Sequence, residues 1–577
     1  MRRLFVGFLA TVGFLFIFGL VGVMIIIMRT INPDTTVSLP DRFVLMVDME
    51  EQSSTEHIPH QGLLAALTTS KQLTFYDLTQ TMNAAVKDKR ITSILFKIDG
   101  CNLSVAQIQE LRDLISDFRD TGRDVIAYAH SYGDNSNGTK AYYLASAASE
   151  VVMQPMGEVS ITGFMAEVPF AKTALTDWGI QARLAKRAEY KSMPETVLET
   201  DFTPAHRENL TAIMNGLLDQ VSADIAEDME LPQATIKQYI DGAPYLAEEA
   251  VQLNLINRLE YLTNLKNEMG GGEKVISATT YFHKHHSPDT SHENKIALIF
   301  AEGMILPNGS EDENLLGDYT IEGDSTAHTI DQAAKDPHVK AIVIRLSSGG
   351  GSPTASETIA EAVQRAKASG KPVIMSMSSV AASGGYWIAT QGSKIVAQPG
   401  TITGSIGVYG GKIITQTAWA NHGVNWGEVH RGSNAGMWSS SMDYSDMGWQ
   451  KVNDMMDNIY QGFIQRVSNS RGLDIGRVTE LAKGRVWLGV EAKGNGLVDQ
   501  LGGLNDAIAL AKAEAKLDGR EVSIDEFPKR KSIFDTLINL SPSAEAKTLI
   551  RMSGLPISTF FGTAKRYPLQ MTEFSIK

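Results

Sequence analysis

The sequence predicts an α/β fold in which one structural unit occurs twice along the chain. Short β-branched runs such as "AIVIRL" (341–346) alternate with helical patterns of about 10–15 residues. The two halves of the chain also match each other at a nearly constant offset. Alternating strands and helices favour a largely parallel sheet flanked by helices. Because 577 residues are enough for more than one domain, we expect two similar α/β domains in tandem.

The repeat consists of matched segments that keep their order along the chain. Their offsets are 248, 244, 244 and 242 residues, so the halves differ only by short insertions and deletions. The matched pairs are "ITSILFKID" (91–99) with "VKAIVIRLS" (339–347), "YYLASAASEVVMQP" (142–155) with "YWIATQGSKIVAQP" (386–399), "KTALTDWGI" (172–180) with "QTAWANHGV" (416–424), and "DGAPYLAEEAVQLNLIN" (241–257) with "KGRVWLGVEAKGNGLVD" (483–499).

The repeat and the composition divide the chain into five parts. Residues 42–268 and 295–527 are the predicted repeat domains. The polar, histidine-dense stretch 269–294 between them is predicted to be a solvated linker, and its histidine spacing matches no metal-ligand set. Residues 1–30 precede the first repeat. Residues 528–577 form a C-terminal extension for which the sequence predicts no function.

Residues 1–30 are predicted to be a membrane anchor. Positions 4–28 are 25 residues without a charge. As a helix rising about 1.5 Å per residue, this run would reach roughly 37 Å, which exceeds the ~30 Å hydrocarbon core of a bilayer. A cleaved secretory signal has a shorter apolar region followed by small residues. Since Arg2 and Arg3 favour a cytoplasmic N-terminus, we expect a single-pass protein of the bacterial inner membrane with both repeats in the periplasm.

The composition excludes several classes of function. The net charge of −14, with no basic stripe, argues against nucleic-acid binding. Cys101 is the single cysteine of the chain, so no intrachain disulfide can form. A cysteine nucleophile would need an adjacent base, and Cys101 is better interpreted as a small buried residue. The sequence predicts no cofactor and no bound metal.

The stretch "AASGGYWIA" (381–389) has the features of a serine nucleophile. Ser383 precedes Gly384 and Gly385, which leave the backbone open to the approach of a substrate carbonyl. The N–H group of the residue after the serine can face an oxyanion. No histidine stands in an arrangement that would make it the base, so the residues alone leave the proton acceptor open.

Four motifs in order resemble the signal peptide peptidase A (protease IV) family in its long, duplicated form. They are "EYKS" (189–192), "SSGGGSPTASE" (347–357), "AASGGYW" (381–387) and "TGSIGV" (403–408). The resemblance implies two tandem Clp-protease/crotonase-like domains and a homotetramer. It also implies a membrane-anchored serine endopeptidase that hydrolyses cleaved signal peptides and other apolar peptides.

The same resemblance implies roles for individual residues. Ser383 would be the nucleophile, Lys191 the general base, and the hydroxyl of Ser405 would hydrogen-bond the lysine. A lysine base near neutral pH needs a pKa lowered by roughly two to three units, which burial can supply.

The oxyanion hole implied by the resemblance uses backbone N–H groups of two glycine-rich turns. These would belong to Gly384 and to Gly350 or Gly351. Gly349 stands where the family usually has a proline, which predicts a looser loop at this point.

The repeat predicts that the two halves divide the catalytic groups between them. At an offset of 244, Lys191 corresponds to Ala435, so the second half lacks its own base. Ser383 corresponds to Thr139, which Lys140 and Ala141 follow instead of two glycines, and we expect Thr139 to be a loop residue. The catalytic centre is therefore expected to assemble across both halves.

Two other functions remain as alternatives. An acyl-CoA hydratase or isomerase shares the crotonase fold, and it predicts acidic catalytic residues near the glycine turns. A non-catalytic membrane scaffold on an inactive protease fold predicts an unreactive serine. Labelling of Ser383 by a serine-directed inhibitor would separate a protease from both.

Overall fold

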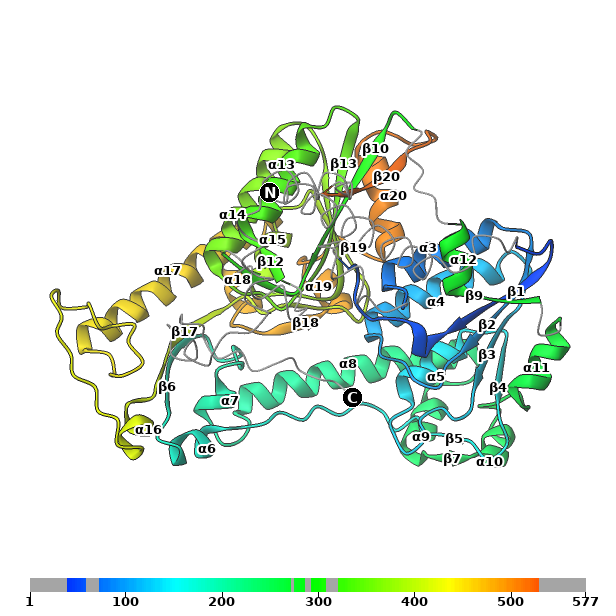
Figure 1. Cartoon of the computed structure of the whole chain (residues 1–577), viewed down its shortest axis with the longest axis horizontal. Coiled ribbons are helices and arrows are strands. Elements are labelled where there is room, and N and C mark those ends of the chain that lie inside the picture. Colours follow the sequence, from blue (N-terminus) through cyan, green and yellow to red (C-terminus); the bar gives the residue numbers. More distant parts are fainter. Residues whose placement is uncertain (1–38, 59–71, 271–273, 286–291, 308–319, 529–577) are drawn as a thin grey trace, which may run out of the picture.

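The computed structural model describes residues 39–58, 72–270, 274–285, 292–307 and 320–528. Two α/β halves lie side by side, and an arm of strands and helices extends from the second half (Figure 1). The predicted anchor, 1–30, and all but the first residue of the extension 528–577 fall outside the described residues. Over the described ranges, no helix is both long enough and apolar enough to cross a membrane.

The elements of the first half alternate between strands and helices, as the sequence predicts. Its strands are β1 (Phe43–Asp48), β2 (Ile91–Lys97), β3 (Val125–Ala129), β4 (Glu150–Met153), β5 (Glu158–Val159), β6 (Gln181–Arg187), β7 (Tyr245–Leu246), β8 (Arg258–Leu259) and β9 (Val275–Ser277). Its helices are α3 (Phe75–Lys87), α4 (Val105–Arg119), α5 (Thr139–Ser146), α6 (Lys172–Asp177), α7 (Glu195–Leu198), α8 (Pro204–Asp228), α9 (Gln233–Gly242), α10 (Ala247–Gln252), α11 (Leu262–Met269) and α12 (Ala278–His285).

The second half repeats this alternation. Its strands are β10 (Lys295–Glu302), β11 (Met304–Leu306), β12 (Thr320–Glu322), β13 (Val339–Ser348), β14 (Val373–Ala382), β15 (Lys394–Ala397), β16 (Ile402–Gly404), β17 (Val408–Ile414), β18 (Val486–Leu488), β19 (Gln500–Leu501) and β20 (Ser523–Phe527). Its helices are α13 (Gly323–Lys335), α14 (Pro353–Ala368), α15 (Gly384–Ala389), α16 (Gln416–Asn421), α17 (Asp446–Arg471), α18 (Ile475–Leu481), α19 (Gly489–Gly494) and α20 (Leu504–Glu514).

The two main sheets have the same topology. The first runs β9-β1-β2-β3-β4-β8, and the second contains the matching path β20-β10-β13-β14-β15-β19, with every neighbouring pair parallel. The second sheet also carries β16 beside β14 and the antiparallel β18 beside β16. Helices cover both faces of each sheet, so strands such as β13 are apolar on both sides and almost wholly buried.

The expectation of a solvated linker over 269–294 is wrong for its central part. β9 pairs with β1 at the edge of the first sheet. The following helix α12 packs on α3, and its Tyr281 is fully buried and donates a hydrogen bond to Asp88 Oδ2 at 3.1 Å. β9 occupies the place that β20 has in the second sheet. It is therefore the last strand of the first repeat. The sequence did not predict it because the residues around it are polar.

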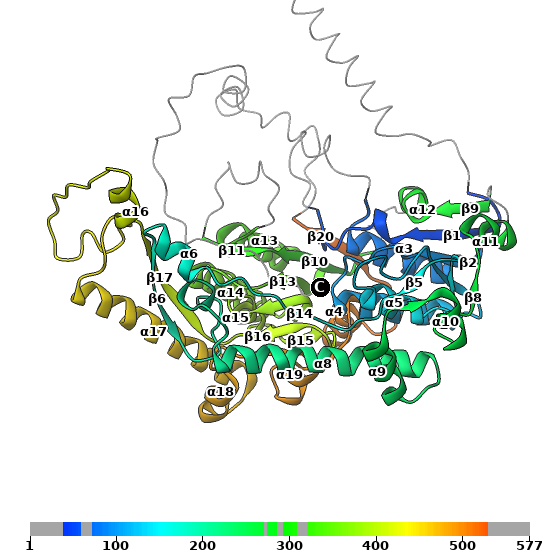
Figure 2. The ribbon, with the colours of Figure 1, turned by 90° about the horizontal axis from the view of Figure 1, so that it is seen from below.

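The first half reaches across to the second through β6. This strand pairs antiparallel with β17, from Arg187 opposite Val408 to Gln181 opposite Ile414. The 25-residue helix α8 then runs back beneath both halves (Figure 2), and its Asn209 exchanges hydrogen bonds with the backbone of Val486. The segment between β6 and α8 is thereby held in the second half, although the sequence places it in the first.

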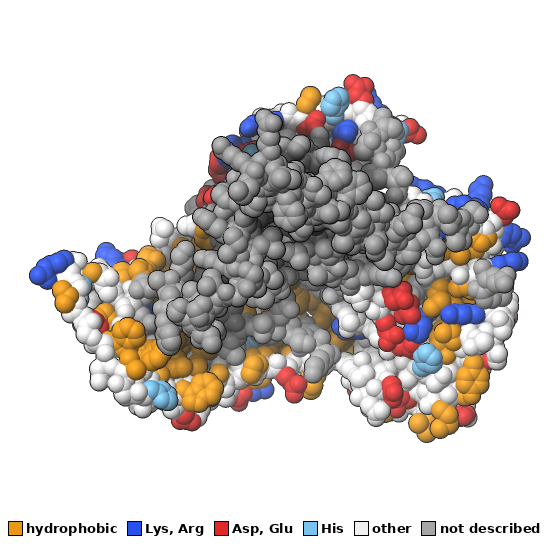
Figure 3. Space-filling view, viewed as in Figure 1, with side chains coloured by type: hydrophobic (Ala, Val, Ile, Leu, Met, Phe, Trp, Pro, Cys, Tyr) orange, Lys and Arg blue, Asp and Glu red, His pale blue; other side chains and the backbone are white. Residues whose placement is uncertain are grey.

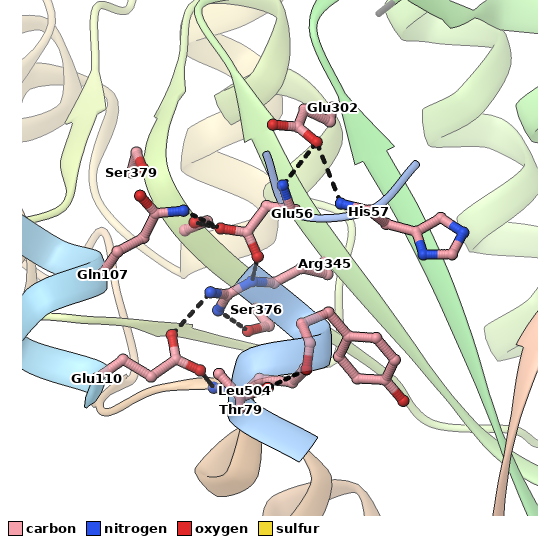
Figure 4. Close-up of polar contacts among 12 residues, drawn as sticks. Glu56, His57, Thr79, Gln107, Glu110, Glu302, Arg345, Ser376, Ser379 and Leu504 are labelled. Carbon is pink, nitrogen blue, oxygen red and sulfur yellow. Dashed lines mark hydrogen bonds and ion pairs between the residues drawn. The ribbon is translucent and has the colours of Figure 1, made fainter. Parts of the chain in front are cut away.

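A buried ionic network also joins the halves (Figure 4). Arg345 of β13 is 1% exposed, and its guanidinium donates to Glu56 Oε2 at 2.8 Å and to Glu110 Oε2 at 2.7 Å. Both carboxylates belong to the first half and are themselves buried. Gln107 and Ser378 donate to the other oxygen of Glu56. Because unpaired buried charges are costly, these contacts favour one docking arrangement of the two halves.

Candidate active site

Ser383 lies at the junction between β14 and α15, near the carboxyl edge of the second sheet. Its φ of 52° and ψ of −118° are unusual for a residue with a side chain. The N–H group of Ser383 donates to Gly404 O at 2.9 Å, and Trp387 N donates to Ser383 O. Such a strained turn, held by backbone hydrogen bonds, is a common way to present a reactive side chain.

Lys191 follows β6 and reaches Ser383 from the first half of the chain. Its Nζ lies 2.9 Å from Ser383 Oγ, 2.9 Å from Ser405 Oγ and 3.1 Å from Ser405 O. The backbone of this loop rests on the second half, because Tyr190 N donates to Lys483 O at 2.9 Å. Gly484 has a φ of 78°, and a Cβ there would lie 2.5 Å from Lys191 N. Only glycine at position 484 lets the lysine come this close.

Burial controls the charge of Lys191. The residue is 5% exposed, and loss of solvation lowers the pKa of its ammonium group from 10.5 to about 7. Within the described residues, neither Lys191 nor Ser383 has a carboxylate partner that would favour the charged lysine. A substantial fraction of the amine is therefore neutral near pH 7.

Ser405 also contacts the amine of Lys191, through two of its oxygen atoms. It has a φ of 50°, and its N–H group donates to Arg485 O at 2.7 Å. This fixed backbone places both the carbonyl and the hydroxyl of Ser405 on the same amine. The structure thus brings Ser405, the serine of the "TGSIG" motif, together with Ser383 and Lys191.

The glycine loop after β13 lies directly against Ser383. A Cβ on Gly350 would be 2.8 Å from Ser383 Cβ, and a Cβ on Gly384 would be 3.2 Å from Gly351 N. The N–H group of Gly350 already donates to Ser348 Oγ at 3.1 Å. Among the described residues, the N–H groups of Gly351 and Gly384 have no such acceptor. Of the two alternatives that the sequence left open, Gly351 is therefore the better placed donor.

The repeat-related positions lack these arrangements. Thr139 is the first residue of α5, instead of the loop residue expected from the sequence, and its buried hydroxyl exchanges hydrogen bonds with Gly163 O and N. Ala435 lies in an exposed turn. Cys101 is half-buried. Of the described residues of the first half, Lys191 is the one that contacts Ser383 and Ser405 through its side chain.

Sequence reasoning missed three residues that shape the site. Gly484 and Arg485 position Lys191 and Ser405, and Ser348 fixes the glycine loop by donating to Gly303 O at 2.7 Å. The signal for Gly484 was present, because "KGRVW" aligns with "DGAPY" in the first half. Nothing in the sequence indicated that this turn contacts a lysine almost 300 residues earlier.

Comparisons with known proteins indicate the family of the chain. The family model described as "Peptidase family S49" matches residues 117–275 and 365–518, one region in each half. "Protease 4" of Salmonella typhi is 32% identical over 483 residues, covering 80% of this chain and 75% of the relative. "Serine protease SPPA, chloroplastic" of Arabidopsis thaliana is 26% identical, covering 77% of this chain and 66% of the relative.

A shorter relative matches part of the chain. "Putative signal peptide peptidase SppA" of Enterococcus faecium is 30% identical over 223 residues, covering 39% of this chain and 64% of the relative. The two matched regions of the family model together span more than half of the sequence and reflect its duplication. The chain therefore belongs to peptidase family S49, and it is a serine protease.

Proposed function

We propose that the chain is a membrane-anchored endopeptidase that uses Ser383 as its nucleophile and Lys191 as its general base. The observation that carries this proposal is the contact of 2.9 Å between Lys191 Nζ and Ser383 Oγ, made by an amine whose pKa burial lowers to about 7. A neutral amine beside a serine hydroxyl is a sufficient base for acyl transfer.

The contacts of Lys191 account for the direction of proton transfer. A neutral amine has two N–H bonds and one lone pair. Ser405 offers two acceptors, its carbonyl and its hydroxyl oxygen, and these take the two N–H bonds. The lone pair then faces Ser383 Oγ. Ser405 would act as a positioning residue that fixes the orientation of the amine.

The reaction follows from this arrangement in two stages. Ser383 Oγ attacks the peptide carbonyl while its proton passes to Lys191, and the N–H groups of Gly384 and Gly351 stabilise the oxyanion. The lysine ammonium returns the proton to the leaving amine, which leaves an acyl-enzyme. Water, deprotonated by the neutral Lys191, then attacks the ester and releases the second product.

The substrate and the location are part of the same proposal. A related protein is named as a putative signal peptide peptidase, and the apolar run at positions 4–28 would hold the chain at a membrane. We propose that cleaved signal peptides and other apolar peptides are the substrates. The catalytic halves would face the periplasm, and identical copies would assemble into a homotetramer.

The test compares purified full-length variants on a synthetic signal peptide, with products identified by mass spectrometry. Ser383→Ala and Lys191→Ala should each lower kcat by at least about 1,000-fold. A serine-directed acylating inhibitor should label Ser383 in the wild-type chain. Cleavage by Ser383→Ala at the wild-type rate would overturn the proposal.

Thr139→Ala supplies the matched control. It removes the hydroxyl at the position related to Ser383 by the repeat, so kcat should stay within about twofold of the wild type. The lost hydrogen bonds to Gly163 should cost about 1 kcal/mol of stability.

No observation favours the acyl-CoA alternative, because the contacts of Ser383 and Lys191 are not those of an acidic catalytic pair.

A further inference from the structure

Trp387 of α15 is held by an ion pair that the catalytic proposal does not use. This side chain is buried and stands four residues after Ser383. Its Nε1–H group donates a hydrogen bond to Glu357 Oε2 of α14 at 2.8 Å. Arg466 of α17 donates to both oxygens of the same carboxylate, and its guanidinium carbon lies 4.9 Å from the centre of the Trp387 ring. Glu357 therefore links three helices, α14, α15 and α17.

Two of these helices begin at the proposed donors of the oxyanion hole. Helix α15 starts at Gly384, and α14 starts two residues after Gly351, with Ser352 as its N-cap. The two helices lie close together, since a Cβ on Gly384 would be 2.6 Å from Ser356 Oγ of α14. The position of each helix thus sets the position of one N–H group, and the packing of α14 against α15 sets the distance between the two groups.

Helix α17 also contacts the loop that carries Lys191. This helix runs from the arm, where Figure 3 shows hydrophobic side chains on the surface, into the body of the second half (Figure 1). Its Asp457 accepts a hydrogen bond from Arg187, at the start of the lysine loop. Further along the helix, Phe463 packs on Trp387, with ring centroids 4.8 Å apart. One helix therefore contacts the supports of both the base and the nucleophile.

The repeat places different side chains at the same three positions of the first half. At offsets of 248, 244 and 242, they are Gln109 of α4, Tyr143 of α5 and Asp224 of α8. Tyr143 donates a hydrogen bond to Asp224, whereas Gln109 accepts one from Gly400 N of the second half at 2.7 Å. The carboxylate that accepts from both of the other side chains is therefore found in the half that contains Ser383.

We propose that Trp387 and Glu357 are positioning residues for the oxyanion hole of the proposed protease. The carboxylate of Glu357, held by Arg466, fixes α15 against α14. The N–H groups of Gly384 and Gly351 then point at the same oxygen. Backbone donors stabilise an oxyanion best when they are already in place, because a displaced donor has to move during the reaction. This inference rests on the proposed catalytic function, and it concerns the oxyanion and leaves the transfer of the serine proton unchanged.

The main variant is Trp387→Phe in the full chain. Phenylalanine keeps a ring that can pack on Phe463 but removes the N–H group that binds Glu357, so thermal unfolding should show a retained fold. We expect kcat on a synthetic signal peptide to fall about tenfold, with KM within about twofold of the wild type. The inhibition constant of a peptide aldehyde of the same sequence should rise by about the same factor, because its adduct with Ser383 places an oxyanion in the hole.

Variants on α14 separate this role from a general loss of packing. Glu357→Ala removes the acceptor of Trp387 and the partner of Arg466, and kcat should fall at least about 30-fold. Glu357→Gln retains an acceptor oxygen for Trp387 and should recover part of this loss. Glu361→Ala is the matched control, because it removes an ion pair with Arg365 one turn further along the same helix, and it should leave kcat unchanged.

The pH profile distinguishes failure of this proposal from failure of the catalytic one. In Trp387→Phe and Glu357→Ala, the midpoint of kcat/KM against pH should stay at the wild-type value, because the contacts of Lys191 are retained. A shifted midpoint would show that the base has moved. Unchanged kcat, or unchanged binding of the aldehyde, would show that the hole does not depend on Trp387. Each of these results would overturn the positioning role and leave the catalytic pair standing, whereas cleavage by Ser383→Ala at the wild-type rate would overturn both.

Discussion

Ser383 and Lys191 each have a conformation or an environment that is unusual for their residue type. The serine adopts a positive φ, and the lysine is buried with oxygen atoms of Ser383 and Ser405 around its amine. Both departures cost folding free energy, since a strained backbone and a buried amine are unfavourable. At the scale of the residue, stability is exchanged for a reactive pair.

The pH dependence of activity follows from the charge of Lys191. Below about pH 7 the amine is protonated in the folded protein and cannot accept the serine proton. We expect kcat/KM to rise with pH through a midpoint near 7 and then level off, measured on a peptide substrate from pH 5 to 9. Histidine-directed reagents should not remove this rise of kcat/KM with pH. A midpoint that disappears when a histidine is replaced would contradict the assignment of the base.

The same pKa predicts that Lys191→Met stabilises the protein at acidic pH. The folded pKa of about 7 lies below the unfolded value of 10.5, so between these values the unfolded chain binds more protons and stability rises with pH. At pH 6 the wild type bears the full cost of a buried ammonium, and the variant should be more stable by about 2–4 kcal/mol. The difference in the free energy of unfolding between the variant and the wild type, measured by urea unfolding, should shrink toward pH 10. A variant less stable than wild type at pH 6 would show that the amine is well solvated.

Among the elements, the loop between β6 and α7 determines whether the centre forms. It is anchored at its start by Arg187, which pairs with Asp457 of α17, and at its end by Glu195, a buried carboxylate that accepts from Lys186, Thr203 and His206. Lys191 lies between these two fixed points. Its close approach to the second half depends on Gly484.

Replacement of Gly484 by alanine should therefore disable the enzyme without unfolding it. A Cβ at this position would lie 2.5 Å from Lys191 N and 2.8 Å from its Cα, so the lysine loop must move away from Ser383. We expect kcat to fall at least about 100-fold, since small displacements of a catalytic group are costly.

Gly472→Ala is the matched control for this element. Gly472 also has a positive φ, 65°, but a Cβ there meets nothing within 4 Å. Gly472→Ala should lose about 1 kcal/mol of stability in thermal unfolding from backbone strain, and Gly484→Ala should lose more because its Cβ also meets the backbone of Lys191. Only Gly484→Ala should lose activity, and equal losses in the two variants would attribute the effect to strain alone.

The repeat and the alternation of strands and helices were enough to predict two α/β units with mainly parallel sheets. β13 and β14 were recognisable from the sequence because both are almost wholly buried and contain short apolar, β-branched runs. β9 was not, because three residues of strand in a polar stretch carry too little pattern, and only its pairing with β1 defines it. Thr139 was also misjudged, since its helix starts directly after the loop that the sequence suggested.

For the site, the sequence predicted the groups but not how they are held. Ser383, Lys191 and Ser405 stand in recognisable motifs, and the structure brings all three together. The N–H group of Gly350 is not free for an oxyanion because it donates to Ser348 Oγ. The spacing of these two residues in the sequence is not distinctive, so the sequence did not predict this contact. The support from Gly484 and Arg485 arises from tertiary packing, which local sequence patterns do not encode.

In the whole molecule, buried charges are shared between the two halves. Arg345 of the second half has its counter-charges, Glu56 and Glu110, in the first half. All three side chains are buried, so separation of the halves would expose or strand ionic groups.

Removal of the arginine alone should thus be more damaging than removal of the whole network. Arg345→Met leaves two uncompensated buried carboxylates and should destabilise the full chain by about 3–5 kcal/mol. The triple variant Arg345→Met, Glu56→Gln, Glu110→Gln carries no stranded charge and should recover at least half of that loss. Urea unfolding of the single and triple variants measures the difference. Equal stability of the two would show that the charges do not interact.

The crossing of β6 into the second half also sets when, during synthesis, the protease can first act. Lys191 and Ser383 are 192 positions apart, which a ribosome adding about 5–20 residues per second needs roughly 10–40 s to cover. The turn that supports the lysine, at Gly484, is translated later still. Until then the lysine stays in water as an ordinary ammonium ion, and Ser383 lacks the base that would activate it. The catalytic pair can therefore assemble only after the second half has been translated.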